Sequence, residues 1–389
     1  MDVTIIGGGI SGLALAHELA PDHRVTVLES APGPRGGGYM IDFFGPGFRA
    51  AERMGVIDEL RRRGRAFDGV RYGRPDGAET GRIDAAPLVR AAGGRYFSIL
   101  RPEVEQGLLA VLPSQVELRR GARAVAVRDR EGAASGTPDG AVVTLEDGSE
   151  IAADLVVACD GVRSAWREQV APGHGGIVPM GYRVACYLVE DPALAAELGD
   201  RMLMTDTVGR VGWLYAADAA RVGVMLSERT DPHEDRRPEP DPDHLRRRFT
   251  GLHPQIDAAL EHVPAAGEYY DDLVAQSSAP RWSRGRLVLA GDAALAPSLL
   301  AGQGTSLAIA GAEVLARSLR AAGPHVEVGL EEYERAWRPT TERIARSGRL
   351  SAGAFIPSTM LRLRTQQIAR RAVGLPGVSR LLARSFIAA

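Results

Sequence analysis

Residues 1–30 read MDVTIIGGGISGLALAHELAPDHRVTVLES, and this stretch decides the fold of the chain. Residues 2–6 form a short, apolar, β-branched run that leads directly into the glycine-rich turn at residues 7–12. Apolar residues then recur at helical spacing as far as Pro21, and a second apolar run ends at Glu29. The order of strand, glycine-rich turn, helix, strand and acid predicts a dinucleotide-binding unit.

The residue types in this turn suit a pyrophosphate. Gly7 permits the turn, Gly9 lets the backbone approach the phosphates, and Gly12 lets the helix pack on the strand, while unpaired amides at the helix start face the negative charge. Ser11 is assigned to the same site. Glu29 follows at close to the spacing of about 20 residues that the motif requires, and we expect it to accept hydrogen bonds from an adenosine ribose. A glycine-rich loop without a ligand is the alternative, and the motif alone does not choose between FAD and NAD.

The composition is that of a globular protein. The chain has 389 residues, of which 45% are hydrophobic, enough for a large core and roughly two to three domains. Its 47 basic and 49 acidic residues leave no overall basic field for nucleic acid. We expect no transmembrane helix and no signal peptide, and therefore a cytoplasmic protein. Cys159 and Cys186 are predicted to be reduced core thiols, no metal site is predicted, and lysine does not occur in the sequence.

Two later stretches repeat the pattern of a buried strand that ends in an acid. The run at residues 151–159 leads to Asp160, and the run at residues 286–290 leads to Asp292. Because α/β sheets bind ligands at the carboxyl edge of their strands, we expect both acids near the dinucleotide, although an Asp-Gly pair is equally typical of an ordinary turn. Residues 302–305 then open a long helix whose free amides favour an anion, and the ring of a reduced flavin is the expected recipient.

Other stretches are less specific. Arg35, in the loop after Glu29, is expected either to lie over the nucleotide end of the ligand or to be a solvated arginine. Helical periodicity predicts one helix over residues 48–63 and another over residues 244–262. Short alternating runs between residues 166 and 280 predict an antiparallel sheet, six of whose side chains are candidates for the face toward the ligand, although plain core is the commoner role of such residues. These six are Tyr182, Arg183, Met204, Trp213, Tyr215 and Met225.

Three separated motifs together resemble the class A flavoprotein monooxygenases of the para-hydroxybenzoate hydroxylase fold. They are GGGISG with Glu29, CDGVRS at residues 159–164, and GDAALAPSLLAGQGTS at residues 291–306, in the family's order. The resemblance covers residues 1–165 and 281–340, whereas the intervening region matches in layout only.

The resemblance implies noncovalent FAD, reduced by NADPH or NADH, which reacts with O2 to give a C4a-hydroperoxide and hydroxylates an electron-rich ring. It assigns Arg101 to the flavin ribityl and phosphate region, and Val125 to the adenine. It assigns Asp160 to the space between pyrophosphate and nicotinamide cofactor, and Asp292 to the ribityl chain or phosphate. The residues expected to face flavin N1 and O2 are Gly302, Gln303, Gly304 and Thr305.

The expected fold class is α/β, with a Rossmann-like FAD-binding domain, an inserted antiparallel-sheet substrate domain and C-terminal helices. The FAD-binding domain is predicted at residues 1–69, 98–165 and 281–340, the substrate domain at residues 70–97 and 166–280, and the helical segment at residues 341–389.

The third motif departs from the family's usual pattern. Leu295 stands where His is usual, Leu299 where a proline is common, Ser306 where Asn is frequent, and Gly311 where Asp is frequent. We expect FAD binding to survive these changes and the pocket wall beside the flavin to differ. No catalytic residue is assigned.

Several alternatives are open at this level. A flavin-dependent halogenase would need a tunnel lysine and a WxWxI segment, and the sequence contains neither. A flavin oxidase or reductase on the same fold would carry the same cofactor motifs, and a non-catalytic nucleotide-binding protein is a further possibility. The favoured interpretation is an aromatic hydroxylase of secondary metabolism that acts on a bulky phenolic or polyketide-like molecule.

The C-terminal segment has an unusual charge. Beyond Glu342 the chain carries nine arginines and no acidic residue, interleaved with apolar residues. We favour helices that bridge the two domains, with arginine stems covering apolar surface. Contact with a membrane surface is the less favoured alternative.

Overall fold

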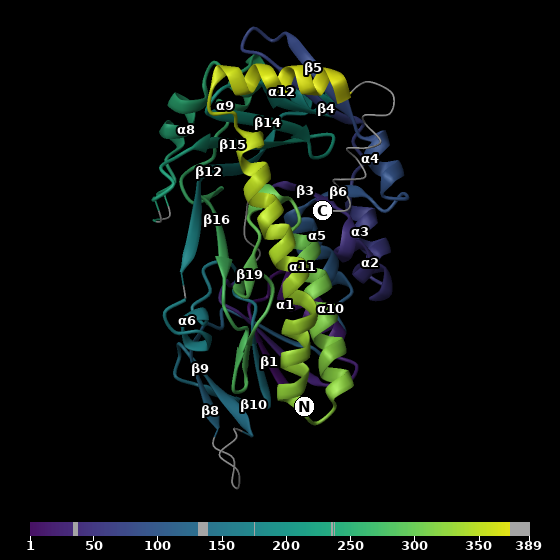
Figure 1. The fold of residues 1–389 in the computed structure, drawn as a ribbon, viewed down its shortest axis with the longest axis vertical. Coiled ribbons are helices and arrows are strands. Elements are labelled where there is room, and N and C mark those ends of the chain that lie inside the picture. The colour runs from purple at the N-terminus through teal and green to yellow at the C-terminus, as the bar shows by residue number, and fades with distance from the viewer. Residues whose placement is uncertain (34–37, 131–138, 175, 235, 237, 374–389) are drawn as a thin grey trace.

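The computed structural model describes residues 1–33, 38–130, 139–174, 176–234, 236 and 238–373. Figure 1 shows two sheets at opposite ends of the long axis, joined by long helices. The mixed architecture of sheets and C-terminal helices confirms the predicted α/β fold class.

The first sheet has six strands and is built around β1. In spatial order its strands are β17 (Ser283–Arg284), β18 (Leu287–Leu289), β11 (Leu155–Ala158), β1 (Asp2–Ile6), β2 (Arg24–Glu29) and β7 (Glu117–Arg120). All neighbours pair parallel except β17 with β18, and the register places Ile6 beside Ala158 and Ala158 beside Leu289. The segments that follow these three residues therefore leave the sheet at one edge.

Helices and a small sheet cover the two faces of this first sheet. α1 (Ile10–Leu19) packs against α10 (Gly304–Ala322), which packs in turn against α11 (Val326–Phe355). The opposite face contacts a meander of β8 (Ala124–Arg130), β9 (Gly140–Leu145) and β10 (Glu150–Ala153). One large hydrophobic core runs through these layers.

The second sheet has eight strands. In spatial order they are β19 (Leu295–Ala296), β16 (Tyr270–Ser278), β12 (Ile177–Glu190), β15 (Arg221–Arg229), β14 (Arg210–Ala216), β13 (Arg201–Thr205), β4 (Gly69–Gly73) and β5 (Glu79–Asp84). Only the pair of β13 with β4 is parallel. The short β19 comes from the third motif, so that motif joins this sheet to the start of α10.

One face of the second sheet is covered by α7 (Pro192–Leu198), α8 (Pro242–Phe249) and α9 (Pro254–Leu260), which form a separate hydrophobic core with it. The other face carries a second apolar cluster that includes Tyr182, Met204 and Met225. Between the sheets lie the paired strands β3 (Met40–Phe43) and β6 (Phe97–Leu100). The short helices α4 (Ala86–Ala91) and α6 (Arg167–Val170), with α5 (Arg101–Ala110), complete the connections.

Two predicted helices are each divided in the structure, so the prediction of continuous helices was wrong. Residues 48–63 fall in α2 (Gly45–Arg53) and α3 (Ile57–Arg63), separated at Gly55, whose φ of +75° is left-handed. Residues 244–262 fall in α8 and α9, separated at Gly251, whose φ is +79°. Glycine adopts this conformation without a steric penalty, and a helix does not continue through it.

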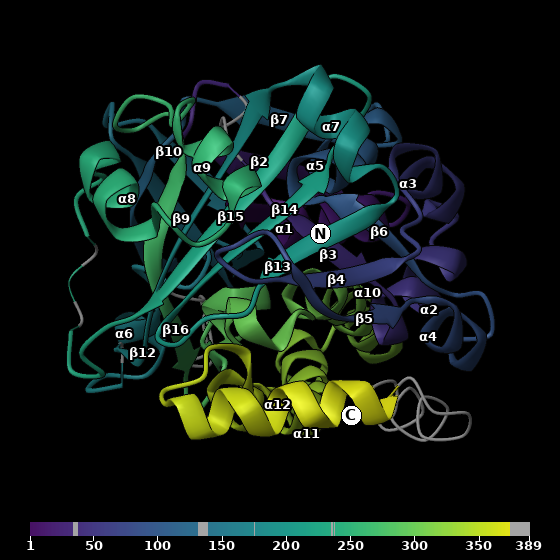
Figure 2. The same ribbon diagram turned by 90° about the horizontal axis from the view of Figure 1, so that it is seen from above.

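The C-terminal helices differ in their surroundings. α11 runs along the long axis from the first sheet to the second, which it contacts where Gln276 donates to the Ala345 carbonyl at 2.8 Å. α12 (Met360–Val373) lies across the far end of the second sheet (Figure 2). None of the described helices has the length and apolarity that crossing a bilayer requires. Cys159 and Cys186 are buried and free.

Candidate functional site

The glycine-rich turn brings β1, α1 and β11 into close contact. A Cβ atom at Gly12 would lie 2.0 Å from the Gly7 carbonyl oxygen, and one at Gly7, whose φ is +109°, would lie 2.5 Å from the Cys159 carbonyl oxygen. Gly9 faces open space, since its nearest neighbour would be a Glu105 oxygen at 3.9 Å. No side chain caps α1, so its first amides are available to a ligand.

Glu29 is held at the carboxyl end of β2 by backbone donors. Its two carboxylate oxygens accept hydrogen bonds from Gly8 N at 2.9 Å and Ala31 N at 2.8 Å. The amide of Ala122 donates to the Glu29 carbonyl at 3.0 Å, which brings the start of β8 alongside. There the Val125 side chain is 52% exposed, so an apolar ring could lie against it. Arg35 lies outside the described residues.

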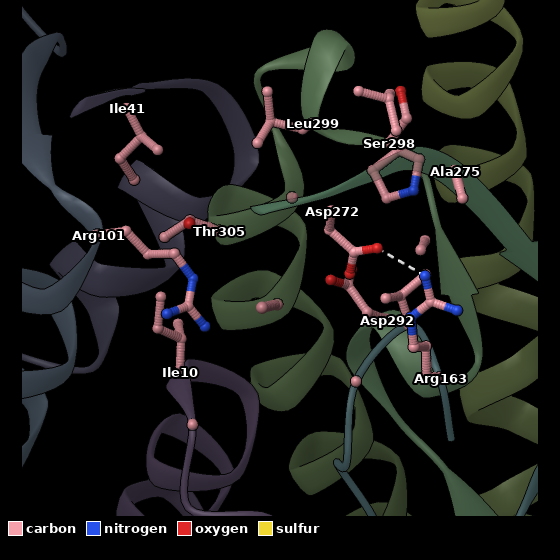
Figure 3. Close-up of a pocket in the computed structure, with 18 of the residues that line it drawn as sticks. Ile10, Ile41, Arg101, Arg163, Asp272, Ala275, Asp292, Ser298, Leu299 and Thr305 are labelled. Atoms are coloured by element: carbon pink, nitrogen blue, oxygen red, sulfur yellow. Dashed lines mark hydrogen bonds and ion pairs between the residues drawn. The ribbon is translucent and has the colours of Figure 1, made fainter. Parts of the chain in front are cut away.

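A cleft opens between the two sheets, and its space, open solvent included, is about 1130 Å³. One wall consists of the turn before α1, the loop after β11 and the start of α10; the other consists of β12 and β16 residues, among them Val184 and Val274. Figure 3 shows Arg101 and Asp292 directed into this cleft from opposite sides. Arg101 also pairs with Glu105 at 2.9 Å.

The electrostatics of the cleft depend on which charges are paired. Burial raises the pKa of Asp292, and the nearby Arg101 and Arg167 oppose that shift. Arg167, which is fully buried, donates to the carbonyls of Ala293 and Val162 at 3.0 Å and thereby ties the second motif to the third. The sequence analysis missed Arg167, whose only signal is its place just after CDGVRS.

Two polar atoms beside the turn have no hydrogen-bond partner in the described part of the chain. They are Ser11 Oγ and Asp160 Oδ1, both buried. The other Asp160 oxygen accepts from Ala165 N at 2.9 Å, and burial raises the pKa of this carboxyl. A hydroxyl donor and a carboxyl acceptor of this kind suit a ligand that offers both phosphate oxygens and hydroxyl groups.

The start of α10 is open toward the cleft. Gly302 has a φ of +66°, Gln303 precedes the helix without a side-chain capping bond, and Gly304 is the first helical residue. A Cβ atom at Gly302 or Gly304 would meet nothing within 4 Å. Thr305 lines the same cleft. The first amides of α10 are therefore positioned to stabilise an anion.

Two partly buried phenols also line the cleft, and neither was predicted. The rings of Tyr39 and Tyr270 lie 5.9 Å apart. Burial raises the pKa of Tyr39 to about 12 and also raises that of Tyr270, so both groups are neutral hydrogen-bond donors at physiological pH. Arg163 pairs with Asp272 at 2.6 Å on the opposite wall (Figure 3). Tyr39 directly follows the glycine-rich loop, which is its only sequence signal.

The six candidates for the substrate face take different positions. Tyr182, Met204 and Met225 belong to the apolar cluster on the face that α7, α8 and α9 leave uncovered. Arg183 points to the other face, where it forms an ion pair with Asp271 at 2.8 and 2.6 Å. The Tyr215 hydroxyl accepts from Met40 N at 2.8 Å. None of the six lines the first cleft.

Met204 and Trp213 line a second cavity, of about 330 Å³, between the second sheet and α12. Tyr72 and Phe355 add aromatic surface to it. The Trp213 Nε1–H group is buried and lacks a partner among the residues described. Asp206, on the cavity wall, accepts from Thr80 and from α12.

The departures in the third motif are mostly packing residues. Ser306 Oγ donates to the Phe44 carbonyl at 2.7 Å and accepts from Gly47 N at 2.8 Å. A Cβ atom at Gly311 would lie 2.6 Å from Trp337 Nε1, so α11 packs closely there. Leu295 is buried in the core, whereas Leu299 lines the first cleft. Within the described ranges, no group of three or more His, Cys, Asp or Glu side chains is arranged to hold a metal ion.

Comparisons with known proteins agree with this geometry. A family model described as "FAD binding domain" matches residues 1–347. The chain is 29% identical over 387 residues to 3-amino-4-hydroxybenzoate 2-monooxygenase PtnB3 of Streptomyces platensis, covering 95% of this chain and 93% of the relative. It is 30% identical over 361 residues to 6-hydroxynicotinate 3-monooxygenase of Pseudomonas fluorescens, covering 86% and 88%. The structure of Klebsiella pneumoniae HpxO complexed with FAD and uric acid superposes with a TM-score of 0.81 at 22% identity, covering 100% and 96%.

Proposed function

The chain belongs to the FAD-dependent class A flavoprotein monooxygenases, and from that membership we propose that it hydroxylates a bulky, electron-rich aromatic molecule with NADPH or NADH and O2. The relatives named above act, by their names, on substituted aromatic rings. One observation carries the proposal. The first cleft has backbone amides and charged groups on one wall, and its sheet wall adds apolar residues beside the pair of Arg163 with Asp272, so a redox cofactor and an organic substrate would meet in it.

The residues present fit FAD. The amides of the first turn and Ser11 would hold the pyrophosphate, Glu29 the adenosine ribose, and Val125 the adenine. Arg101, Asp160 and Asp292 would bind the ribityl chain and phosphates, and residues 302–305 would face the ring. The unpartnered Ser11 and Asp160 atoms and the open space at Gly302 and Gly304 support this arrangement. When bound, FAD supplies electron transfer from the nicotinamide cofactor and delivery of one oxygen atom.

The chain's own groups would prepare that chemistry. The amides at the start of α10 stabilise negative charge on the ring, and a donor set of this kind contributes roughly 3–4 kcal/mol in a site that excludes water. The neutral phenols of Tyr39 and Tyr270 offer hydrogen bonds without a competing charge. The apolar wall at Val184 and Val274 excludes water from the reacting side.

We propose that the second cavity receives the part of the substrate that does not react. Its wall includes Met204 and Trp213, two of the six predicted substrate residues, together with Tyr72 and Phe355. The unpartnered indole N–H of Trp213 would donate to an oxygen of the ligand. The cavity volume of about 330 Å³ lies at the small end of the range of about 300–1,000 Å³ for drug-sized ligand sites, so the cavity suits one part of a larger molecule. We also propose that the domains have the boundaries predicted from the sequence and that the protein is cytoplasmic.

The test begins with the purified yellow protein. NADPH and NADH oxidation is measured with a panel of phenolic and polyketide-like compounds, and products are analysed after turnover under ¹⁸O2. A compound that stimulates oxidation and gains one ¹⁸O atom supports the proposal. Hydrogen peroxide without labelled product would make the protein an oxidase, and a reduced unlabelled product would make it a reductase. No nicotinamide oxidation under any condition would favour a non-catalytic nucleotide-binding protein.

A further inference from the structure

The outward side of α12 exposes large apolar side chains, with Arg364 between Leu361 and Ile368. Met360, Leu361 and Ile368 are 58%, 76% and 68% exposed, which makes them three of the most exposed large apolar side chains in the described part of the chain. Leu361 and Ile368 are seven positions apart, so they lie on one side of the helix two turns apart. Figures 1 and 2 both place α12 on the outer surface, with no other described element over that side.

The inward side of the same helix is largely polar. Gln367 Nε2 donates to Asp206 at 2.7 Å, and Arg370 pairs with Asp206 at 2.5 Å while its guanidinium lies 3.9 Å from the centre of the Tyr72 ring. Leu363 is the one large apolar side chain that the helix buries within the described ranges. A surface helix that served only as packing would place its apolar residues inward and its polar residues outward. In α12 this arrangement is reversed.

The charge beside the apolar stripe is positive. Arg362 and Arg364 are exposed and make no ion pair with any residue of the described ranges. The neighbouring hairpin of β4 and β5 does not neutralise them, because its acids Asp76 and Glu79 are paired with arginines of their own. The sequence also continues beyond α12 with further arginines and leucines and without an acidic residue.

We propose that α12 is an interfacial helix that binds anionic lipid surfaces. Its apolar stripe would enter the boundary between headgroups and acyl chains, and its arginines would contact the phosphates. A single convex helix at the end of the molecule can lie flat on a membrane, whereas a protein partner would require a complementary groove. The lack of acids after Glu342 favours an anionic surface over a neutral one.

The experiment is co-sedimentation of the full-length, FAD-loaded protein with vesicles at physiological salt. We expect binding to vesicles with about one third phosphatidylglycerol and at least tenfold weaker binding to pure phosphatidylcholine. The double variant Leu361→Glu and Ile368→Glu should reduce binding at least tenfold. The matched control is Val178→Glu with Val328→Glu, which changes equally exposed valines elsewhere and should bind as the wild type does. Flavin absorbance and melting temperature establish that each variant is folded.

Three results would overturn the proposal. The first is equal sedimentation with both vesicle types or with neither. The second is vesicle binding that survives Leu361→Glu with Ile368→Glu but is lost when the chain is ended after Val373, since the segment beyond α12 would then be the anchor. The third is a dimer in sedimentation velocity that the same double variant dissociates, without vesicle binding, because a second copy would then cover the stripe. Loss of vesicle binding in the double variant Arg362→Gln with Arg364→Gln would support the proposal.

Discussion

The start of α1 and the face of the second sheet opposite α7, α8 and α9 are the two regions that we propose bind ligands, and they are built differently. At α1 the site consists mainly of backbone, and the close contacts at Gly7 and Gly12 allow no side chain at these positions. On the sheet the surface consists of side chains, and alternation sends Tyr182 to one face and Arg183 to the other. A site made of backbone atoms requires particular residue types at particular positions in the sequence. A surface made of strand side chains requires only that suitable residues alternate along the strand.

The largest effect is expected from Gly12→Val, which tests the backbone side of this comparison. A Cβ atom there would lie 2.0 Å from the Gly7 carbonyl oxygen, so α1 must move away from β1. We expect FAD affinity to fall at least a hundredfold, measured by titration of the apoprotein. Gly33→Ala is the control, since its Cβ would meet nothing within 4 Å. If the folded Gly12→Val variant binds FAD with wild-type affinity, the site at α1 does not depend on the backbone packing described above.

Gly304→Val tests the second helix start. Its side chain would enter the open space before the first amides of α10 and push the flavin ring away from them. We expect FAD to stay bound at the adenine end while the flavin reduction potential falls and anaerobic reduction by NADPH slows at least tenfold, a change of about 1.4 kcal/mol in the barrier. Gly353→Val, also at a helical glycine with open space, should change neither quantity. An unchanged potential would mean that the ring lies elsewhere.

Arg183→Met tests the side-chain surface of the second sheet. Because it leaves the fully buried Asp271 without its ion pair, we expect the free energy of unfolding to fall by roughly 3 kcal/mol, with FAD affinity and the KM of a substrate unchanged. The exposed pair of Arg24 with Asp2 supplies the control, as Arg24→Met should cost under about 1 kcal/mol. A raised KM for the substrate with an unchanged free energy of unfolding would indicate instead that Arg183 contacts the substrate.

The smallest effect concerns Asp42, on the paired strands between the two sheets. Burial raises the pKa of this carboxyl, although hydrogen bonds from Tyr96 at 2.7 Å and Ser98 at 2.9 Å oppose the shift. A carboxyl whose folded pKa is raised costs stability above that pKa and regains it as the pH falls through it. Asp42→Asn should therefore melt a few degrees above the wild type at pH 8, with the difference vanishing toward pH 4. A constant difference across this range would contradict the assignment.

The sequence predicted the parts of the molecule that depend on local chemistry. The strand, the turn and the acid in residues 1–30 specified β1, α1 and β2. It did not predict the breaks at Gly55 and Gly251, because helical periodicity continues across each glycine while the backbone does not.

Long-range packing accounts for what the sequence could not predict at the site. The position of Arg167 depends on carbonyls more than a hundred residues away, at Asp292 and Ala293. The two-residue strand β19 carries no periodicity of its own, so its pairing with β16 was not predictable. The reversed polarity of α12 depends on Asp206, which is distant in the sequence.

The strand order of the first sheet also determines when the site can form during synthesis. β1 pairs with β11 through Val3 and Leu155, and β11 pairs with β18 through Val156 and Leu287. The first strand therefore leaves the ribosome together with β2 but long before its other neighbour, β11, exists, and such distant pairings are slow and expose unpaired edges in the meantime. A nascent chain that ends before Leu289 has the glycine-rich turn without the completed sheet edge. The start of α10 emerges later still, so the complete site that we propose for FAD can form only after that segment has been synthesised.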